Sequence, residues 1–472
     1  LGNSPVSVEG FAVYPYGWRD RTAYTFSLTP TIQAGSQLDT YLLPSRLTAS
    51  SGGFGIVTFD DSVTSLTVTT NNSSTTDSIL MTFATLEVTA GGAVTINATG
   101  SGSAGNVTTG VIDTSGGSAT GLAGAAAGTV SIISAGDALN IEGAITATGG
   151  TGTTAGADGR VTLQASSGAI VQADGANEIA AKEVVIASTA GAVSLNDVTN
   201  DFGAVSATLT DASKGLTIKN STDLKVGVNE NRAGLVGLTT NGGAINLQSV
   251  SGDVSIDAAI QTSGGTLTSA GADFINTAAI TTDGGAVNLN SQTGVVDIDT
   301  DVTTSGGAFT ATGASAFDSS GINITTSGAD DTAGGAITVT TSTGDLTTGP
   351  LYAKGGNATS GAGVAGAAVT LNAGDVLTID SVIDTRGSAG GLSAGGAGGA
   401  IGLTGTNGIV IGGNLYSAGG SGATVGAGGS VTVNSDTLLD TNLVIDTGSG
   451  AGGITFAGTL DSNVSTTRTL TL

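Results

Sequence analysis

The sequence predicts an all-β protein whose fold is a right-handed parallel β-helix, also called a β-solenoid. A glycine-led tag of five residues recurs along the chain, and apolar residues alternate with polar ones within each tag, which is the period-2 pattern of a strand. The tags are residues 92–96, 128–132, 159–163, 191–195, 243–247, 285–289, 335–339, 399–403 and 429–433. Repeats of this kind indicate a solenoid, in which each unit buries its apolar face against its neighbours.

The length of one coil can be read where the repeat is most regular, in residues 243–321. Gly-Gly pairs divide this segment into units that begin near Ala244, Thr266, Ala286 and Ala308, about 21 residues apart. One unit contains three short strand-like runs, at 286–290, 295–299 and 302–304. A coil of this length with three faces predicts a parallel β-helix, because it is too short for repeats that contain a helix.

Longer coils carry extra residues just before the next tag. These insertions are rich in Gly, Ala, Ser and Thr and cover residues 116–128, 149–159, 355–366, 387–399 and 419–429. Because they recur at one corner of the coil, they predict Gly/Ala-rich corner loops that project from one edge of the solenoid. Such loops either pack on one another as passive flaps or form a stacked ridge that contacts a neighbouring molecule.

The first 46 residues differ in composition from the rest of the chain. They hold four of the five prolines and a dense group of aromatic residues, namely Phe11, Tyr14, Tyr16, Trp18, Tyr24 and Phe26. We therefore predict two parts, an amino-terminal cap or assembly segment at 1–46 and a β-helix at 47–472. If the segment assembles, these aromatic residues dock on the open carboxyl end of another copy, and its strands pair with the free edge. Such head-to-tail contacts build open filaments.

Charge and composition exclude several classes of partner and chemistry. The chain has 37 acidic and 12 basic residues, a net charge of −25, and neither Cys nor His. Nucleic acid is not expected as a partner, because phosphate binding needs clustered Lys and Arg. Disulfides, thiolate or imidazole metal sites and His-dependent catalysis are also excluded. No apolar run reaches the ~18 residues of a transmembrane helix.

Three carboxylates lie close together in one repeat, at Asp297, Asp299 and Asp301. When coils are aligned on their isoleucines, a polar ladder is expected to join Asp257, Asn276, Asp299 and Asn323. Bound Ca²⁺ would relieve repulsion between stacked carboxylates, since it takes six to eight oxygen ligands. The predicted ligands are Asp257, Asp297, Asp299 and Asp301, and the alternative is that these carboxylates are simply solvated. No other cofactor is expected.

An enzyme is the weakest of the functional alternatives. A β-helix hydrolase of polysaccharides would need a pair of carboxylates at a defined separation. Asp60-Asp61 and Asp330-Asp331 are such pairs, but the first lies near the start of the solenoid and the second in a Gly/Ala loop. A lyase would need a basic residue beside an acidic cluster, and the basic residues are spread thinly. We expect no catalytic residues.

Tags of the form Gly-Ala-Val-x-Leu, together with residues 450–460 (GAGGITFAGTL), resemble the filamentous-haemagglutinin-like repeat proteins of bacteria. The resemblance covers about residues 47–472 and implies a secreted, very long parallel β-helix that acts as an adhesin or surface fibre. The secretion domain typical of that family, with its Asn-Pro-Asn-Gly-type motif, does not occur in this sequence.

Together these observations predict an extracellular structural protein at a bacterial cell surface, which forms a fibre, sheath or biofilm filament by head-to-tail self-assembly. The alternative is an adhesin whose corner loops bind cell-surface polysaccharide or another glycan.

Overall fold

The computed structural model describes residues 6–16, 25–32, 54–59, 63–71, 78–87, 92–98, 106–136, 138–173, 175, 177–227, 237–359, 361–450, 452–462 and 467–472. Within these residues it contains 46 strands and no helix. Contacts between Cα atoms divide the chain into two units, Leu1–Thr239 and Thr240–Leu472. Strand β19 (Leu238–Asn241) lies at the division.

The first unit begins with antiparallel pairs. β1 (Val6–Tyr16) pairs with both β3 (Phe54–Phe59) and β5 (Ser78–Glu87), and β2 (Thr25–Ile32) pairs with β4 (Val63–Asn71). The two strands of the amino-terminal segment therefore share their sheets with strands that follow residue 47.

From β4 and β5 onward, the strands of the first unit are parallel and stack in three columns. The first column is β4, β6 (Ala93–Ala98), β9 (Val130–Ser134), β12 (Arg160–Ala165), β14 (Ile179–Ser188) and β16 (Asp201–Ala212). The second column is β5, β7 (Val107–Thr109), β10 (Ala138–Ile141), β13 (Ala169–Gln172), β15 (Val193–Leu195) and β17 (Leu216–Asn220). The third column is β5, β8 (Val111–Asp113), β11 (Ile145–Ala147), β14, β16 and β18 (Leu224–Val226). β5, β14 and β16 each belong to two columns, because each continues from one face to the next without a corner.

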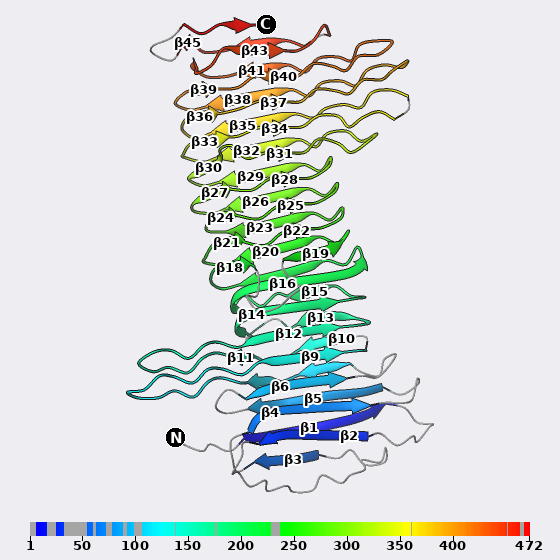
Figure 1. Cartoon of the computed structure of the whole chain (residues 1–472), viewed down its shortest axis with the longest axis vertical. Coiled ribbons are helices and arrows are strands. Elements are labelled where there is room, and N and C mark those ends of the chain that lie inside the picture. Colours follow the sequence, from blue (N-terminus) through cyan, green and yellow to red (C-terminus); the bar gives the residue numbers. More distant parts are fainter. Residues whose placement is uncertain are drawn as a thin grey trace. The chain divides into compact units, whose positions relative to one another are not determined.

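The second unit consists of nine coils with three strands each (Figure 1). The first column is β20 (Ile245–Ser249), β23 (Leu267–Gly271), β26 (Val287–Ser291), β29 (Phe309–Gly313), β32 (Ile337–Thr341), β35 (Val369–Ala373), β38 (Ile401–Gly405), β41 (Val431–Val433) and β44 (Ile454–Phe456). The second is β21 (Val254–Ile256), β24 (Phe274–Asn276), β27 (Val295–Ile298), β30 (Ala316–Ser319), β33 (Leu346–Thr348), β36 (Leu377–Ile379), β39 (Ile409–Ile411), β42 (Thr437–Leu439) and β45 (Leu460–Ser462). The third is β22 (Ile260–Gln261), β25 (Ile280–Thr281), β28 (Val302–Thr303), β31 (Ile324–Thr325), β34 (Leu351–Tyr352), β37 (Ile383–Asp384), β40 (Leu415–Tyr416), β43 (Leu443–Asp446) and β46 (Leu470–Thr471).

The predicted all-β class, the parallel stacking and the three strands per coil are confirmed. The first three coils of the second unit begin at residues 245, 267 and 287, which agrees with the predicted repeat of about 21. The right-handed turn of the coil stays a prediction.

Alternate residues of each strand point inward and form a narrow apolar core. Val339, Leu371 and Leu403 are paired across three neighbouring coils, and all three are fully buried. The core also holds aromatic rings, and Phe309 packs edge-to-face against Phe317 with ring centroids 6.4 Å apart. The outward residue between two inward ones is mostly Thr, Ser or Asn, which explains the period-2 pattern of the tags.

Short corners after the third strand are closed by a buried threonine. The hydroxyl of Thr282 donates to the carbonyl oxygen of Gly285 (2.5 Å), and Thr304 does the same to Gly307 (2.5 Å). Between them stand two residues with positive φ, such as Asp283 (50°) and Gly284 (108°). Asp-Gly suits such a turn, because Asp tolerates positive φ and Gly adopts it without steric cost. We call this Thr–Gly contact the corner clamp.

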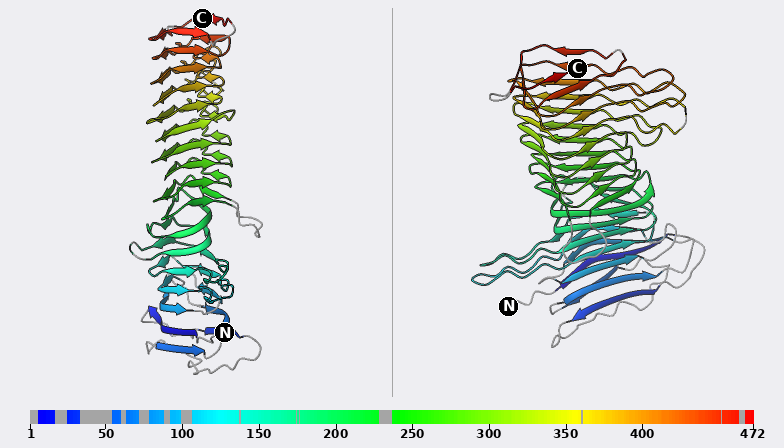
Figure 2. Two further views of the ribbon diagram at one scale, coloured as in Figure 1. Left: turned by 90° about the vertical axis from the view of Figure 1, so that its left-hand side faces the viewer. Right: turned by 45° about the horizontal axis from the view of Figure 1, so that its top comes forward.

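The predicted corner loops are extended arms that open at the corner clamp. In the coil of β37, Thr385 donates to the carbonyl of Gly399 (2.7 Å), so the clamp closes the base of an arm formed by residues 386–398. Thr326 with Gly335 and Ser417 with Gly429 close two further arms in the same way. Figure 2 shows the arms of the second unit projecting from the same side of successive coils.

The arms stack on one another through backbone hydrogen bonds that repeat every three residues. Gly395 donates to Thr424 of the next arm and Gly398 donates to Ala427, while Gly396 bonds across its own arm to Ser388. Glycine is required here, because a Cβ on Gly396 would lie 2.0 Å from a carbonyl oxygen of the preceding arm. The arms therefore form an ordered ridge, and its contact with a neighbouring molecule stays a prediction.

Candidate functional site

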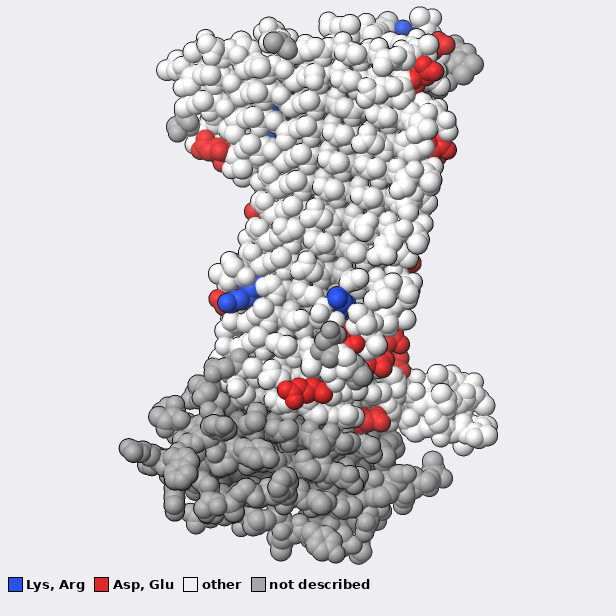
Figure 3. Space-filling model, turned by 180° about the vertical axis from the view of Figure 1, so that it is seen from behind, with Lys and Arg blue, Asp and Glu red and all other residues white. Residues whose placement is uncertain are grey.

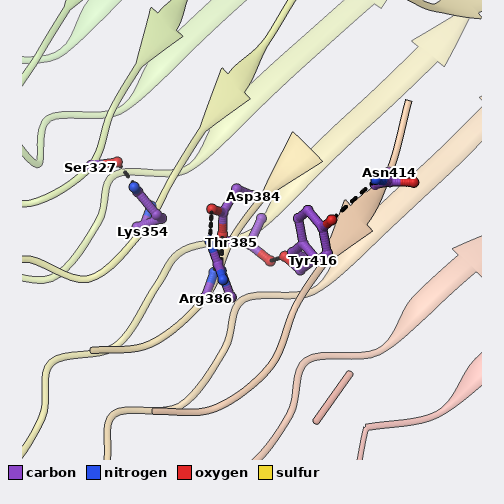
Figure 4. Close-up of polar contacts among 7 residues, drawn as sticks. All are labelled: Ser327, Lys354, Asp384, Thr385, Arg386, Asn414 and Tyr416. Carbon is purple, nitrogen blue, oxygen red and sulfur yellow. Dashed lines mark hydrogen bonds and ion pairs between the residues drawn. The ribbon is translucent and has the colours of Figure 1, made fainter. Parts of the chain in front are cut away.

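A group of aromatic and charged side chains lies on the outer face of the third column, at the base of the arms. The register places Tyr352 of β34, Asp384 of β37 and Tyr416 of β40 opposite one another on three successive coils. Lys354 and Arg386 each follow two residues later and begin an arm (Figure 4). We call these five residues the tyrosine column.

The centre of the tyrosine column is an ion pair. Arg386 donates from Nε to Asp384 Oδ1 (2.9 Å) and from a terminal nitrogen to Oδ2 (2.6 Å), a bidentate arrangement that fixes both side chains. Asp384 is only 3% exposed, whereas about half of the Arg386 side chain is exposed. The hydrogen bond and charge of Asp384 raise the pKa of Arg386, against the effect of its own burial.

A cation lies over each tyrosine ring. The ammonium nitrogen of Lys354 is 5.4 Å from the ring centroid of Tyr352, and the guanidinium carbon of Arg386 is 5.1 Å from that of Tyr416. Both distances are typical of cation–π contacts. The side-chain amide of Asn414 donates to the hydroxyl oxygen of Tyr416 (3.1 Å) and accepts from the backbone N–H of Val444 (3.0 Å). The ring of Tyr416 is therefore held by a hydrogen bond and a cation, and the ring of Tyr352 by a cation alone.

Sequence reasoning missed the tyrosine column, because its members are 32 and 64 residues apart. A signal was available, since Tyr352 and Tyr416 are the only tyrosines after residue 41, and each follows a leucine at the third strand of a coil. Aligning coils by their third strands would have placed both tyrosines on one face.

The four predicted calcium ligands do not form a single site. Asp257, Asp299 and Asp301 are exposed and Asp297 is half-buried, and Asp301 accepts hydrogen bonds from Asn323. Among the described residues, no group of three or more Asp or Glu side chains is placed to hold a metal. Calcium binding itself stays a prediction.

The predicted polar ladder is wrong in its register. Asn276 pairs with Ile256 and Ile298, so it lies in the buried column, one position before Asp257 and Asp299. The reason is that the inward residues of its coil are Phe274 and Asn276, which turns Ile275 outward. The buried amide nitrogen of Asn276 donates to the carbonyl of Ala278 in its own corner (3.2 Å) and to that of Thr300 in the corresponding corner of the next coil (3.0 Å), so it joins the two corners.

The predicted assembly residues fall into two groups. Phe11, Tyr14 and Tyr16 belong to β1, and Phe26 belongs to β2, where the backbone alone is described. Phe11 pairs with Gly55 of β3 on one side and with Phe83 of β5 on the other, so both edges of the strand are occupied at this position. Trp18 and Tyr24 lie outside the described residues. Their part in assembly stays a prediction.

The first unit contains an acidic group beside buried amides. Burial, with nearby Asp201 and Asp197, raises the pKa of Glu178. The pKa of Asp197 is lowered, because hydrogen bonds from Thr199 and from the backbone of Asn177 outweigh the effect of burial. These hydrogen bonds stabilise a corner of the backbone, so we assign the group a structural role.

The two carboxylate pairs that a hydrolase could use are Asp60-Asp61 and Asp330-Asp331. Asp330 and Asp331 are exposed in an arm, where they accept hydrogen bonds from Asn357 and Thr359 of the next arm. Asp60 and Asp61 lie outside the described residues.

In the part of the chain that the structure describes, no helix has the length and apolar character needed to cross a membrane. Comparison of the chain with protein-family models, with curated proteins and with solved structures finds no match in any of the three.

Proposed function

We propose that this chain is an extracellular structural protein of a bacterial surface, and that copies assemble head to tail into a fibre, sheath or biofilm filament. The observation that carries the proposal is repetition. Nine coils of the second unit repeat the same three strands, and eight of them continue the same buried columns. This is the arrangement of a protein that extends over a long distance. The face of this unit seen in Figure 3 carries few charges, most of them aspartates near its margins.

We place the proposed head-to-tail contact at the coil formed by β44, β45 and β46. In the preceding coils, the inward residues of all three strands are buried. In this coil Ile454 and Phe456 are half-buried and Leu460 is 37% exposed. A coil stacked on this one would bury these apolar side chains and pair the strand edges. In the proposed fibre that coil comes from the amino-terminal strands of a second copy.

The proposal is tested with two matched variants of the full chain. A Leu460→Lys change places a charge among the inward residues of the last coil, whereas Asp461→Lys places it on the neighbouring outward residue of the same strand. We expect filaments in electron micrographs of the parent chain and of Asp461→Lys, and shorter or no filaments with Leu460→Lys. A parent chain that stays monomeric at every concentration in sedimentation would overturn the proposal.

The tyrosine column favours the second candidate, an adhesin that binds glycans. Its aromatic rings and fixed hydrogen-bonding groups are the residue types that line sites for polar organic ligands. The sequence predicts glycan binding by the corner loops. The tyrosine column lies instead on the sheet at the base of those loops.

A further inference from the structure

The tyrosine column concentrates residue types that are rare in the second unit. Residues 240–472 contain two tyrosines and three cationic residues. Both tyrosines and two of those cations, Lys354 and Arg386, meet on one face across three coils. The ion pair between Asp384 and Arg386 needs neither tyrosine ring. The presence of both rings beside it therefore suggests a role beyond stabilising the coil.

The local charge of the column identifies the class of ligand. Asp384 neutralises Arg386, and Asp446, opposite Tyr416 on the next coil, adds a second negative charge near Arg386. The two cations and two carboxylates along these four coils therefore sum to zero charge. The chain as a whole carries a charge of −25, which repels polyanions at long range. A neutral ligand is therefore favoured over an anionic one.

The column offers both apolar surface and fixed hydrogen-bonding groups. Each tyrosine is half-buried, and each ring is oriented by a cation. Asn414 donates to the hydroxyl oxygen of Tyr416, which leaves the phenolic hydrogen available to a ligand. Lys354 forms no ion pair with any described residue, so its ammonium group can donate as well. Rings held in this way lose little conformational entropy when they bind.

The spacing of the rings suits an extended ligand. The tyrosines are two coils apart, and neighbouring parallel strands are separated by about 4.8 Å, so the rings are about 10 Å apart along the column. A chain of sugar rings can cover both, since pyranose rings have apolar C–H faces for the aromatic rings and hydroxyls for the polar groups. We propose that the tyrosine column binds a neutral polysaccharide along the direction in which the coils stack. This proposal does not depend on filament formation.

Affinity electrophoresis of the full chain tests the inference, in gels that contain a neutral glucan, mannan or xylan, or an anionic polyuronate. We expect at least one neutral polysaccharide to retard the parent chain. Tyr352→Ala and Tyr416→Ala should each weaken that binding about tenfold, which corresponds to about 1.4 kcal/mol. Tyr416→Phe should retain most of the binding. The matched controls are Thr338→Ala and Thr370→Ala, which change half-exposed residues of the first column.

Thermal unfolding of each variant separates loss of binding from loss of structure. The tyrosine variants should unfold within a few degrees of the parent chain, because the bidentate Asp384–Arg386 pair remains. The inference is overturned if no neutral polysaccharide retards the parent chain, or if a folded Tyr352→Ala, Tyr416→Ala double variant is retarded as strongly as the parent. Retardation by the polyuronate alone would also overturn it, and would assign the column to an anionic ligand through Lys354.

Discussion

Two sets of coils in the second unit differ at one corner and agree everywhere else. The coils of β22, β25 and β28 turn after their third strand through two residues, whereas those of β31, β34, β37 and β40 insert between eight and thirteen residues at the same place. The strands on either side keep their register in both sets. The comparison teaches that corner length and core packing are independent, because each coil closes before its arm begins. The corner clamp closes it in the coils of β31, β37 and β40, and in the coil of β34, where Ala353 takes the place of the threonine, a backbone hydrogen bond from Ala367 N–H to the Ala353 carbonyl (2.7 Å) does so.

The largest expected effect comes from the core that both sets share. Leu371→Ala removes a fully buried side chain that packs between Val339 and Leu403, and it should lower the free energy of unfolding by about 2–5 kcal/mol. Thr370→Ala, at the neighbouring outward position, should change it by less than about 0.5 kcal/mol. Chemical denaturation measures both. Equal losses would contradict the assignment of the inward face.

Loss of the corner clamp should lower the free energy of unfolding by a similar amount in a coil with a short corner and in a coil that carries an arm. Thr304→Val and Thr385→Val each remove the hydroxyl that bonds to a buried glycine carbonyl, and each should cost about 1–3 kcal/mol. A Thr303→Val change on the outward neighbour of Thr304 is the control. If Thr385→Val has no effect while Thr304→Val does, the arms are held by their mutual contacts and the clamp is not general.

Within the ridge of arms, a larger side chain should disturb the structure more at a glycine position than at an alanine position. Gly396→Ala places a methyl group 2.0 Å from a carbonyl oxygen of the preceding arm, whereas Ala397 is exposed. We expect Gly396→Ala to speed hydrogen exchange at the amides of Ser388 and Gly396 by about tenfold, with a smaller effect on global unfolding, because arms open locally. Ala397→Ser should leave exchange at these amides unchanged. The opposite order would show that the arms are not stacked in this way.

The smallest effect concerns pH. Burial, with nearby Asp299 and Asp318, raises the pKa of Asp297. The folded chain therefore binds this proton more tightly than the unfolded chain, and stability is lost as pH rises from the ordinary aspartate pKa through the raised one. Asp297→Asn should stabilise the protein at neutral pH, on the order of a few tenths of a kcal/mol because water screens a half-exposed group. The gain should vanish below the ordinary aspartate range, and a gain that is independent of pH would contradict this cause.

The fold could be predicted because its determinants are local. Alternating apolar residues after a glycine define the inward face of each first strand, and the spacing of Gly-Gly pairs gives the length of a coil. The arms were found as insertions, since Gly and Ala stand out at 387–399. Their threefold hydrogen-bonding pattern was not predicted, because it depends on which arm lies beside which.

The candidate site could not be predicted in the same way. Tyr352 and Tyr416 are separated by 64 residues and become neighbours through the register of β34, β37 and β40. Arms of unequal length between them hide that register from any fixed repeat. The same difficulty affected Asn276, where one isoleucine in the outward phase shifted the expected ladder by a residue.

The corner clamp also makes the solenoid a scaffold for engineering. A segment that enters and leaves beside one Thr–Gly contact does not alter the coil around it, so foreign peptides or small domains could be grafted between Thr304 and Gly307. Inserts on successive coils would be displayed at intervals set by the strand spacing, as a regular array of chosen ligands.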